Sequence, residues 1–233
     1  MRFEQPLVEG TLLRRYKRFF VDVRLRDGQQ ITVHCDNPGS LLGCSEPGSR
    51  VLLSVHSGSE RKFKHQLEIV FAGRTPVGIH NGRPNSVVAE AIHDGRLPEL
   101  AGYASLKQEV PYGRASRVDL LLAGNGLRPC YVDVKNVTLA DNGVAYFPDA
   151  VTDRGTRHLA QLTDMIREGK RAMVIFVAQR ADVCRFKPAD HIDQEFGQAL
   201  RDAMARGVEA VCYRTKVTRK GIELDEKLPI ELN

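Results

Sequence analysis

The first 80 residues of the chain consist of short hydrophobic runs separated by turn residues. Residues 10–25 predict a half-buried strand, because they end in the alternating hydrophobic residues Phe19, Val21, Val23 and Leu25, with polar residues between the later ones, which places Phe19 on the inner side. Asp27-Gly28 predicts a tight hairpin, with the partner strand over residues 30–35. Further strands are predicted over residues 51–55, 67–71 and 77–80. Five short strands in this length are typical of a small closed barrel such as an OB-fold, although an SH3-like barrel would give nearly the same pattern.

Near residue 82 the spacing of hydrophobic residues changes, and helical periods begin to alternate with strand-like runs. A helix is predicted over residues 85–93 with Asn85 as its N-cap, and another over 152–169 that ends at Gly169. The run from 172 to 178 is apolar at every position, as in a strand buried on both faces. The other predicted elements are strands over 106–110, 118–122, 130–138 and 208–213 and a helix from 190 to 207. Their order along the chain is α-β-β-β-α-β-α-β.

The two predicted domains, residues 1–82 and 83–233, differ in charge. The first contains twelve Lys and Arg against eight Asp and Glu and the second 22 against 21, so most of the net charge of +5 lies on the barrel. A basic surface beside an evenly charged domain favours contact with a polyanion such as DNA. The alternative interpretation is that these are solvated strand and loop residues. The candidate DNA-binding residues of the barrel are Arg14, Arg15, Lys17, Arg18, Arg61, Lys62 and Lys64.

Composition excludes several classes of protein. Hydrophobic residues make up 42% of the chain and charged residues 27%, as in ordinary globular domains. No apolar run approaches the roughly 18 residues that span a bilayer, and the N-terminus lacks a signal-peptide pattern. The five cysteines are widely spaced without a CxxC pair, which argues against a structural zinc site and a disulfide framework. We therefore expect a cytoplasmic protein.

Two strands of the second domain carry charged residues among apolar ones. Asp119 lies within an apolar strand, and the segment Val132-Asp133-Val134-Lys135 follows in the next. Strand alternation puts Asp133 and Lys135 on one face, and pairing of the two strands would bring Asp119 beside them. Two carboxylates suit Mg²⁺ or Mn²⁺, and a lysine beside them can orient water or stabilise negative charge during phosphodiester hydrolysis. A buried Asp–Lys ion pair is the alternative, but the acids occupy the strands on which PD-(D/E)xK nucleases carry their site.

Three further residues of the second domain are candidates for the same site. Glu90 lies in the helix before the sheet, where nucleases of this class often carry an acid, and it is predicted as a metal ligand and catalytic acid. Arg154 and His158 lie four residues apart on the helix after the lysine strand, so they share one face. His158 is predicted to be catalytic and Arg154 to contact DNA. For all three the alternative is an exposed helix surface.

Several segments of the chain together resemble the sugar fermentation stimulation protein A (SfsA) family. They are residues 34–40, 46–51, 117–119, 131–139, 147–152, 154–155 and 158–159. The resemblance extends over essentially the whole chain. It implies an OB-like domain followed by a PD-(D/E)xK-like domain, non-specific DNA binding and a link to sugar (maltose) metabolism in bacteria. It also implies a metal site at Glu90, Asp119, Asp133 and Lys135, with Asp133 standing where many relatives have Glu.

Three functions compete at this point. The first is a metal-dependent nuclease, the second a catalytically inactive DNA-binding module, and the third a regulator that binds a small phosphorylated ligand. Tyr16, Phe19 and Phe20 do not form a strong aromatic platform by their sequence pattern, so contact with the backbone of duplex DNA is preferred to stacking on single strands. The sequence does not decide between a monomer and a dimer.

Overall fold

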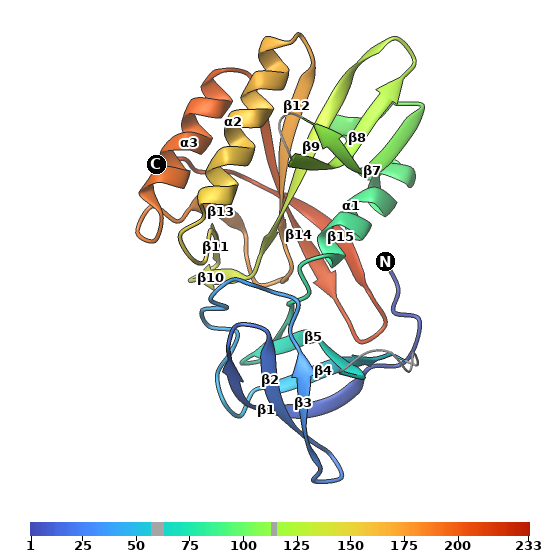
Figure 1. The fold of residues 1–233 in the computed structure, drawn as a ribbon, viewed down its shortest axis with the longest axis vertical. Helices are drawn as coiled ribbons and strands as arrows, with labels where there is room; N and C mark the ends of the chain where they lie inside the picture. The colour runs from blue at the N-terminus through green and yellow to red at the C-terminus, as the bar shows by residue number, and fades with distance from the viewer. Residues whose placement is uncertain (57–62, 113–115) are drawn as a thin grey trace.

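The computed structural model describes residues 1–56, 63–112 and 116–233. Its elements form an N-terminal barrel and a second domain around a six-stranded sheet (Figure 1). The strands of the barrel are β1 (Val8–Tyr16), β2 (Phe20–Leu25), β3 (Gln30–His34), β4 (Arg50–Val55), β5 (His65–Ala72) and β6 (Thr75–Gly78).

The second domain contains three α-helices, a short 3-10 helix and nine strands within the described residues. The helices are α1 (Arg83–His93), the 3-10 helix Pro98–Leu100, α2 (Asp153–Arg167) and α3 (Gln194–Ala205). The strands are β7 (Ser105–Tyr112), β8 (Ser116–Gly124), β9 (Leu127–Val137), β10 (Leu139–Asp141), β11 (Val144–Phe147), β12 (Arg171–Ala178), β13 (Arg185–Pro188), β14 (Glu209–Val217) and β15 (Ile222–Leu228).

The barrel has the topology of an OB-fold. Its strand order is β3-β2-β1-β4-β5, and a parallel bridge between His34 of β3 and Gln66 of β5 closes it. The predicted hairpin at Asp27-Gly28 joins β2 to β3, with Gly28 at a φ of +89°, which glycine adopts without strain. The prediction of an OB-like barrel is confirmed.

The start of the barrel differs from the prediction. The chain reverses at Lys17 and Arg18, whose φ angles are +48° and +63°, so β1 ends before Phe19 and β2 begins after it. Val21 and Val23 point into the barrel core as predicted. Phe19 lies in the turn and is 40% exposed. Its predicted inward orientation is wrong because the alternation begins only after the turn.

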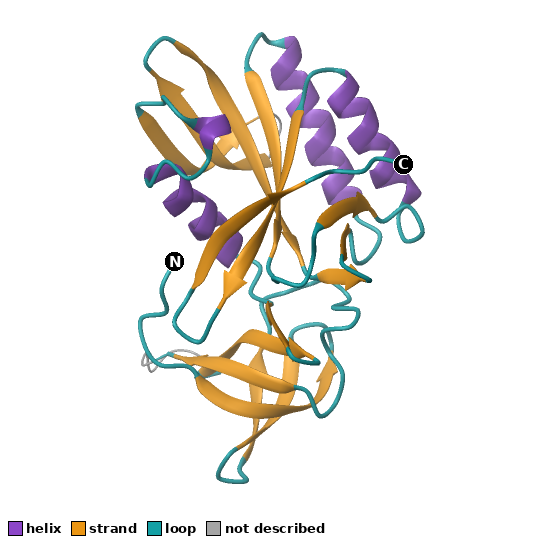
Figure 2. Cartoon of the chain, turned by 180° about the vertical axis from the view of Figure 1, so that it is seen from behind, coloured by secondary structure: helices purple, strands orange, loops and turns teal. Residues whose placement is uncertain are grey.

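The second domain is a sheet covered on both faces. The strand order is β15-β14-β12-β9-β8-β7, and β12 runs parallel to β9 and to β14. Helix α1 lies on one face, and α2 and α3 lie side by side on the other (Figure 2). Successive residues of β12 pack into opposite layers, Ile175 with the α1 side and Phe176 with the α2 and α3 side. The succession α1-β7-β8-β9-α2-β12 is the predicted PD-(D/E)xK core.

Helix ends and short strands were less predictable. Helix α1 begins at Arg83 after Gly82, with Pro84 in its first turn, so Asn85 is not the N-cap. Thr152 caps α2 by accepting a hydrogen bond from the N–H of Gly155. The small sheet β10-β11-β13 was not predicted, because its strands have only three or four residues each.

A buried ion pair joins the barrel to α1. Glu68 of β5 is fully buried, and both of its carboxylate oxygens accept hydrogen bonds from Arg83, at 3.0 and 2.5 Å. Ser54 of β4 donates a third hydrogen bond to the same carboxylate. The predicted domain boundary at residue 82 falls between β6 and α1, and it stays a prediction.

A second set of contacts holds a barrel loop against the second domain. Asp149 accepts a hydrogen bond from the N–H of Leu41, and the Ser40 hydroxyl donates to the carbonyl of Asp149. The fit is close, since a Cβ at Gly39 would lie 2.5 Å from a carboxylate oxygen of Asp149. These contacts position residues 36–40 of the barrel over the end of β9.

Removing Arg83 should destabilise the whole chain. In Arg83→Ala the buried Glu68 loses its counter-charge, and we expect the free energy of unfolding to fall by about 3 kcal/mol in urea denaturation. Arg167→Ala is the control, because its pair with Asp164 is exposed and is worth less than about 1 kcal/mol. Equal effects of the two substitutions would contradict a stabilising role of the buried pair.

Candidate functional site

The acids and the lysine singled out in the sequence meet on neighbouring strands. Leu120 of β8 pairs with Val132 of β9, which brings Asp119 and Asp133 opposite one another. The ammonium of Lys135 lies 2.6 Å from Oδ2 of Asp133. The structure therefore brings Asp119, Asp133 and Lys135 together as strand alternation and pairing predict.

Asp133 is a charged group inside the protein, only 2% exposed. Burial raises the pKa of Asp133, but the charge of Lys135 and a hydrogen bond from His158 outweigh it and hold the pKa well below its ordinary value. Oδ2 of Asp133 lies beside the Lys135 ammonium, yet it accepts no hydrogen bond of good geometry. This buried oxygen therefore has unused capacity to bind a cation or a donor.

Asp119 faces the opposite electrostatic environment. Burial and the nearby negative charge of Asp133 raise the pKa of Asp119 from 3.8 to about 6. Its Oδ2 accepts a hydrogen bond from the N–H of Val134 at 2.7 Å, and its Oδ1 accepts one from Asn85 of α1 at 3.1 Å. Asp119 and Asp133 are thus held close together, and the charge of Lys135 only partly offsets the effect of burial and of Asp133 on the pKa of Asp119.

His158 and Arg154 of α2 lie at the same place. His158 Nδ1 is 3.0 Å from Asp133 Oδ1, and Arg154 Nε is 3.4 Å from His158 Nε2. A neutral imidazole with its proton on Nδ1 satisfies both contacts, since Nδ1–H donates to Asp133 and Nε2 accepts from Arg154. His158 therefore orients Asp133, and Arg154 orients His158.

These side chains line a cavity of about 440 Å³ between the two domains. Asp119, Asp133, Lys135 and His158 form its inner wall, and Arg154 lies beside them. The barrel contributes residues 36–39 to the opposite wall. The site is therefore built by both domains, and not by the second domain alone.

Glu90 is not part of this cavity, contrary to the prediction. Its carboxylate accepts a hydrogen bond from the N-terminal ammonium at 3.0 Å, and Arg96 lies 3.5 Å away. Five residues along a helix correspond to a rotation of about 140°, so Asn85 and Glu90 cannot face the same site. On α1 it is Asn85 that reaches the acids.

The predicted DNA-binding residues have different surroundings. Arg14 pairs with Asp22, and Arg15 donates four hydrogen bonds to backbone carbonyls, which use all but one of its N–H groups. Lys17, Arg18 and Lys64 are exposed. Arg61 and Lys62 lie outside the described residues.

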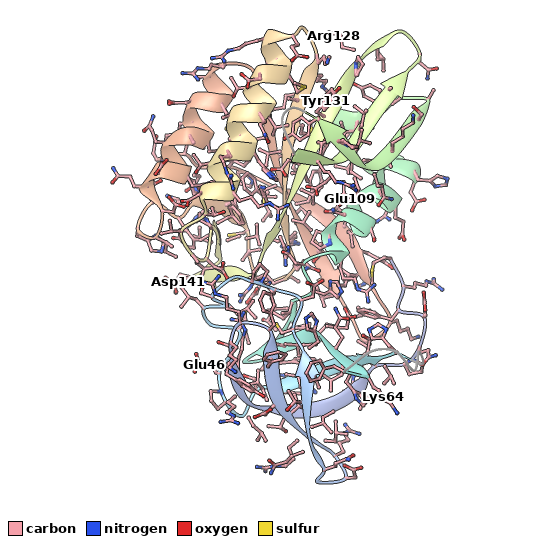
Figure 3. All side chains as sticks on the ribbon, viewed as in Figure 1. Glu46, Lys64, Glu109, Arg128, Tyr131 and Asp141 are labelled. Carbon is pink, nitrogen blue, oxygen red and sulfur yellow. The ribbon has the colours of Figure 1, made fainter. Side chains whose placement is uncertain are left out.

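Glu109 is a lining residue that sequence reasoning missed. It lies on β7 opposite Asp119, at a point where the ladder to β8 is interrupted, and its φ is +53°. Figure 3 shows it near the middle of the molecule, where the sheet approaches the barrel. A positive φ outside glycine is uncommon in a strand, and only backbone geometry reveals it.

Within the described ranges, no group of three or more His, Cys, Asp or Glu side chains is arranged to hold a metal ion. The two acids and the unused oxygen of Asp133 nevertheless fit a hard divalent cation, which prefers carboxylate oxygens. None of the helices in the described parts of the chain combines the length and apolar composition needed to cross a bilayer.

An OB barrel joined to a restriction-endonuclease-like domain is the class that fold and site define. The family model "Sugar fermentation stimulation protein RE domain" matches residues 82–221, and "SfsA N-terminal OB domain" matches residues 13–79. The chain therefore belongs to the sugar fermentation stimulation protein (SfsA) family, as its sequence resemblance indicated.

Relatives match the chain over its whole length. A "Sugar fermentation stimulation protein homolog" of Citrifermentans bemidjiense is 51% identical over 233 residues, covering 100% of both chains. A homolog of Geobacter sulfurreducens is 49% identical over 230 residues, covering 99% of this chain and 98% of its own. The solved structure of Pyrococcus furiosus SfsA in complex with Ca²⁺ has a TM-score of 0.89 at 27% identity, covering 99% of this chain and 98% of that one.

The raised pKa of Asp119 predicts that, in the absence of metal, the free energy of unfolding falls as this carboxyl ionises. The stability that protonated Asp119 contributes is fully present below pH about 4 and is lost as the pH rises through about 6. Asp119→Asn cannot ionise, so it should raise the free energy of unfolding at neutral to alkaline pH, by up to about 3 kcal/mol for a shift of two pKa units.

Urea denaturation in EDTA at several pH values measures this effect. The difference in the free energy of unfolding between Asp119→Asn and the wild type should decrease towards pH about 4, where the wild-type carboxyl is already protonated. Asp141→Asn, at an exposed position on β10, is the control and should show no such trend. A uniform loss of stability in Asp119→Asn at every pH would contradict the prediction.

Proposed function

We propose that this protein is a divalent-metal-dependent nuclease that binds DNA with little sequence specificity and hydrolyses its phosphodiester bonds. The strongest support is the meeting of Asp119, Asp133 and Lys135 at one cavity, with an oxygen of Asp133 that lacks a hydrogen bond. A site that only held DNA would gain nothing from two carboxylates facing a polyanion, since like charges repel.

Asp119 and Asp133 would hold the cation, Mg²⁺ or Mn²⁺. When bound, such an ion polarises a phosphate and lowers the pKa of a coordinated water. The Pyrococcus furiosus relative was solved in complex with Ca²⁺, which supports a site for a hard divalent cation. The shorter arm of Asp at position 133 is braced here by His158 and Lys135.

Lys135 supplies the only ammonium that lines this cavity among the described residues. It lies 2.6 Å from Asp133 and 3.4 Å from His158, so it stays beside the acids while its remaining hydrogens face the cavity. Such a group can orient the attacking water or stabilise the negative charge that develops on the phosphate. Arg154, beside it, is placed to contact a phosphate oxygen.

DNA is the proposed partner because the positive charge gathers on the barrel. Lys17, Arg18 and Lys64 are exposed there, and contacts of this kind bind the phosphate backbone without reading bases. The link to sugar metabolism comes from the family name, and it would act through nucleic acid, since the cavity has the chemistry of a phosphodiester site.

A DNA-binding module without catalysis is the second candidate. It is favoured by one observation, the absence of a three-residue metal-binding group in the described part of the chain. In this case the cavity would hold nucleic acid through Lys135 and Arg154 without cutting it.

Metal binding is tested by thermal denaturation. Mn²⁺ at a hundred times its Kd should stabilise the wild type by about 2.7 kcal/mol, because it binds the folded state alone. Asp133→Asn should abolish this stabilisation. Glu90→Gln is the matched control. If the metal binds through Asp119 and Asp133, Glu90→Gln retains the stabilisation by Mn²⁺. Loss of that stabilisation in Glu90→Gln would identify Glu90 as a metal ligand.

Catalysis is tested by incubating single-stranded, duplex and RNA substrates with Mg²⁺ or Mn²⁺. We expect cleavage by the wild type and a loss of about a hundredfold or more in Asp119→Ala and in Lys135→Ala, since each removes charge at the reacting phosphate. DNA binding should persist in both variants. If the wild type cuts none of these substrates while DNA still binds, the second candidate is the correct one.

A further inference from the structure

The turn between β1 and β2 presents positive charge beside an exposed aromatic ring. Lys17 and Arg18 are exposed, and neither forms an ion pair with a carboxylate among the residues described. Phe19 follows them, 40% exposed, and its ring stacks on that of His34 with centroids 6.2 Å apart and planes within 5°. Two positively charged side chains and an aromatic ring that packs on His34 are therefore neighbours on the surface of the barrel.

The turn is fixed to the wall of the catalytic cavity. The guanidinium of Arg15 donates hydrogen bonds to the carbonyls of Arg18, Asn37, Gly39 and Ser40, at 2.7 to 2.9 Å. Arg15 thus braces the turn and the loop together. The same loop is held to Asp149 of the second domain.

A second cavity, of about 410 Å³, begins at this turn. Residues 15–18 line it on one side, and Pro38, Gly39 and Ala150 on the other. Pro38, Gly39 and Ala150 also line the cavity that contains Asp119 and Asp133. The two cavities therefore adjoin at Pro38, Gly39 and Ala150, and we use the word path for the surface that leads from the basic turn over these residues to the acids.

We propose that this path binds a single strand of DNA, with phosphates at Lys17 and Arg18 and an unpaired base stacked on Phe19. The strand would then cross Pro38 and Gly39 to reach the acids. This inference rests on the proposed function, and it names the form of DNA that the site receives.

An unpaired strand fits these features better than a duplex. Bases of a duplex already stack on one another, so an exposed ring offers them nothing, whereas a single-stranded base gains about 1–3 kcal/mol from an aromatic side chain. The sequence pattern favoured duplex DNA because it placed Phe19 inside the barrel, and the structure removes that objection. Lys64 is not on the path: Figure 3 shows it across the barrel from Glu46, whose neighbour Ser45 lines the second cavity.

The chain contains no tryptophan, which makes a direct test available. Phe19→Trp places a single tryptophan at the proposed stacking position, and its emission, excited selectively over that of the six tyrosines, should be quenched when oligothymidine binds in EDTA. Leu127→Trp is the matched control, because Leu127 is 43% exposed at the start of β9, and Figure 3 shows its neighbour Arg128 at the end of the second domain that lies away from the barrel. Its emission should not change.

Fluorescence anisotropy with labelled oligonucleotides gives the affinities. We expect the wild type to bind a single strand more tightly than a duplex of equal length, and Phe19→Ala to weaken binding of the single strand about tenfold while leaving the duplex unchanged. Phe19→Trp should retain the affinity. Lys17→Gln with Arg18→Gln should reduce the slope of log K against log salt by about 1.4, from two phosphate contacts.

The outcomes separate this inference from the proposed function. Normal single-strand binding by Phe19→Ala, or unquenched emission of the Phe19→Trp variant with DNA bound, overturns the stacking path while cleavage dependent on Asp119 still supports the nuclease. Tighter binding of RNA than of DNA of the same sequence overturns the choice of DNA. Failure of the wild type to bind or cut any DNA overturns both proposals.

Discussion

The site depends on keeping one carboxylate charged inside the sheet. Asp133 is buried, and it stays ionised because the Lys135 ammonium compensates its charge and His158 donates a hydrogen bond to it. These contacts fix the lysine beside the acid and tie α2 to β9. They leave Asp119 as the carboxylate with the weaker compensation, so its pKa stays raised and a bound cation would stabilise its ionised form.

The acids and the lysine were predictable because strand alternation and pairing are local and regular. Glu90 was not, since the side of α1 that approaches the acids depends on how the helix docks on the sheet, and it is Asn85 that contacts Asp119. A small closed barrel and the α-β-β-β-α-β core were likewise predictable from periodicity, whereas the choice of an OB-fold over an SH3-like barrel was not. Contacts between the domains, such as that of Glu68 with Arg83, were not predictable, because the spacing of hydrophobic residues does not indicate which charged side chains will pair.

The turn at Lys17 and Arg18 shows the limit of pattern reasoning most clearly. Two non-glycine residues with positive φ interrupt an apparently continuous strand, and no alternation of hydrophobic residues signals such a break. Phe19 is therefore exposed where the pattern predicted it buried, and this difference is the reason that we propose single-stranded rather than duplex DNA for the barrel. Glu109 escaped notice for the same reason.

The wall that residues 36–39 of the barrel contribute has a consequence for how the two domains are related. Neither domain by itself encloses the acids, so a chain cut between β6 and α1 would have an open groove where the cavity now stands. In the proposed nuclease, substitutions in the barrel loop would therefore change the lining of the cavity that receives the phosphate. The barrel would then serve both to bind the nucleic acid and to form part of the site that cuts it.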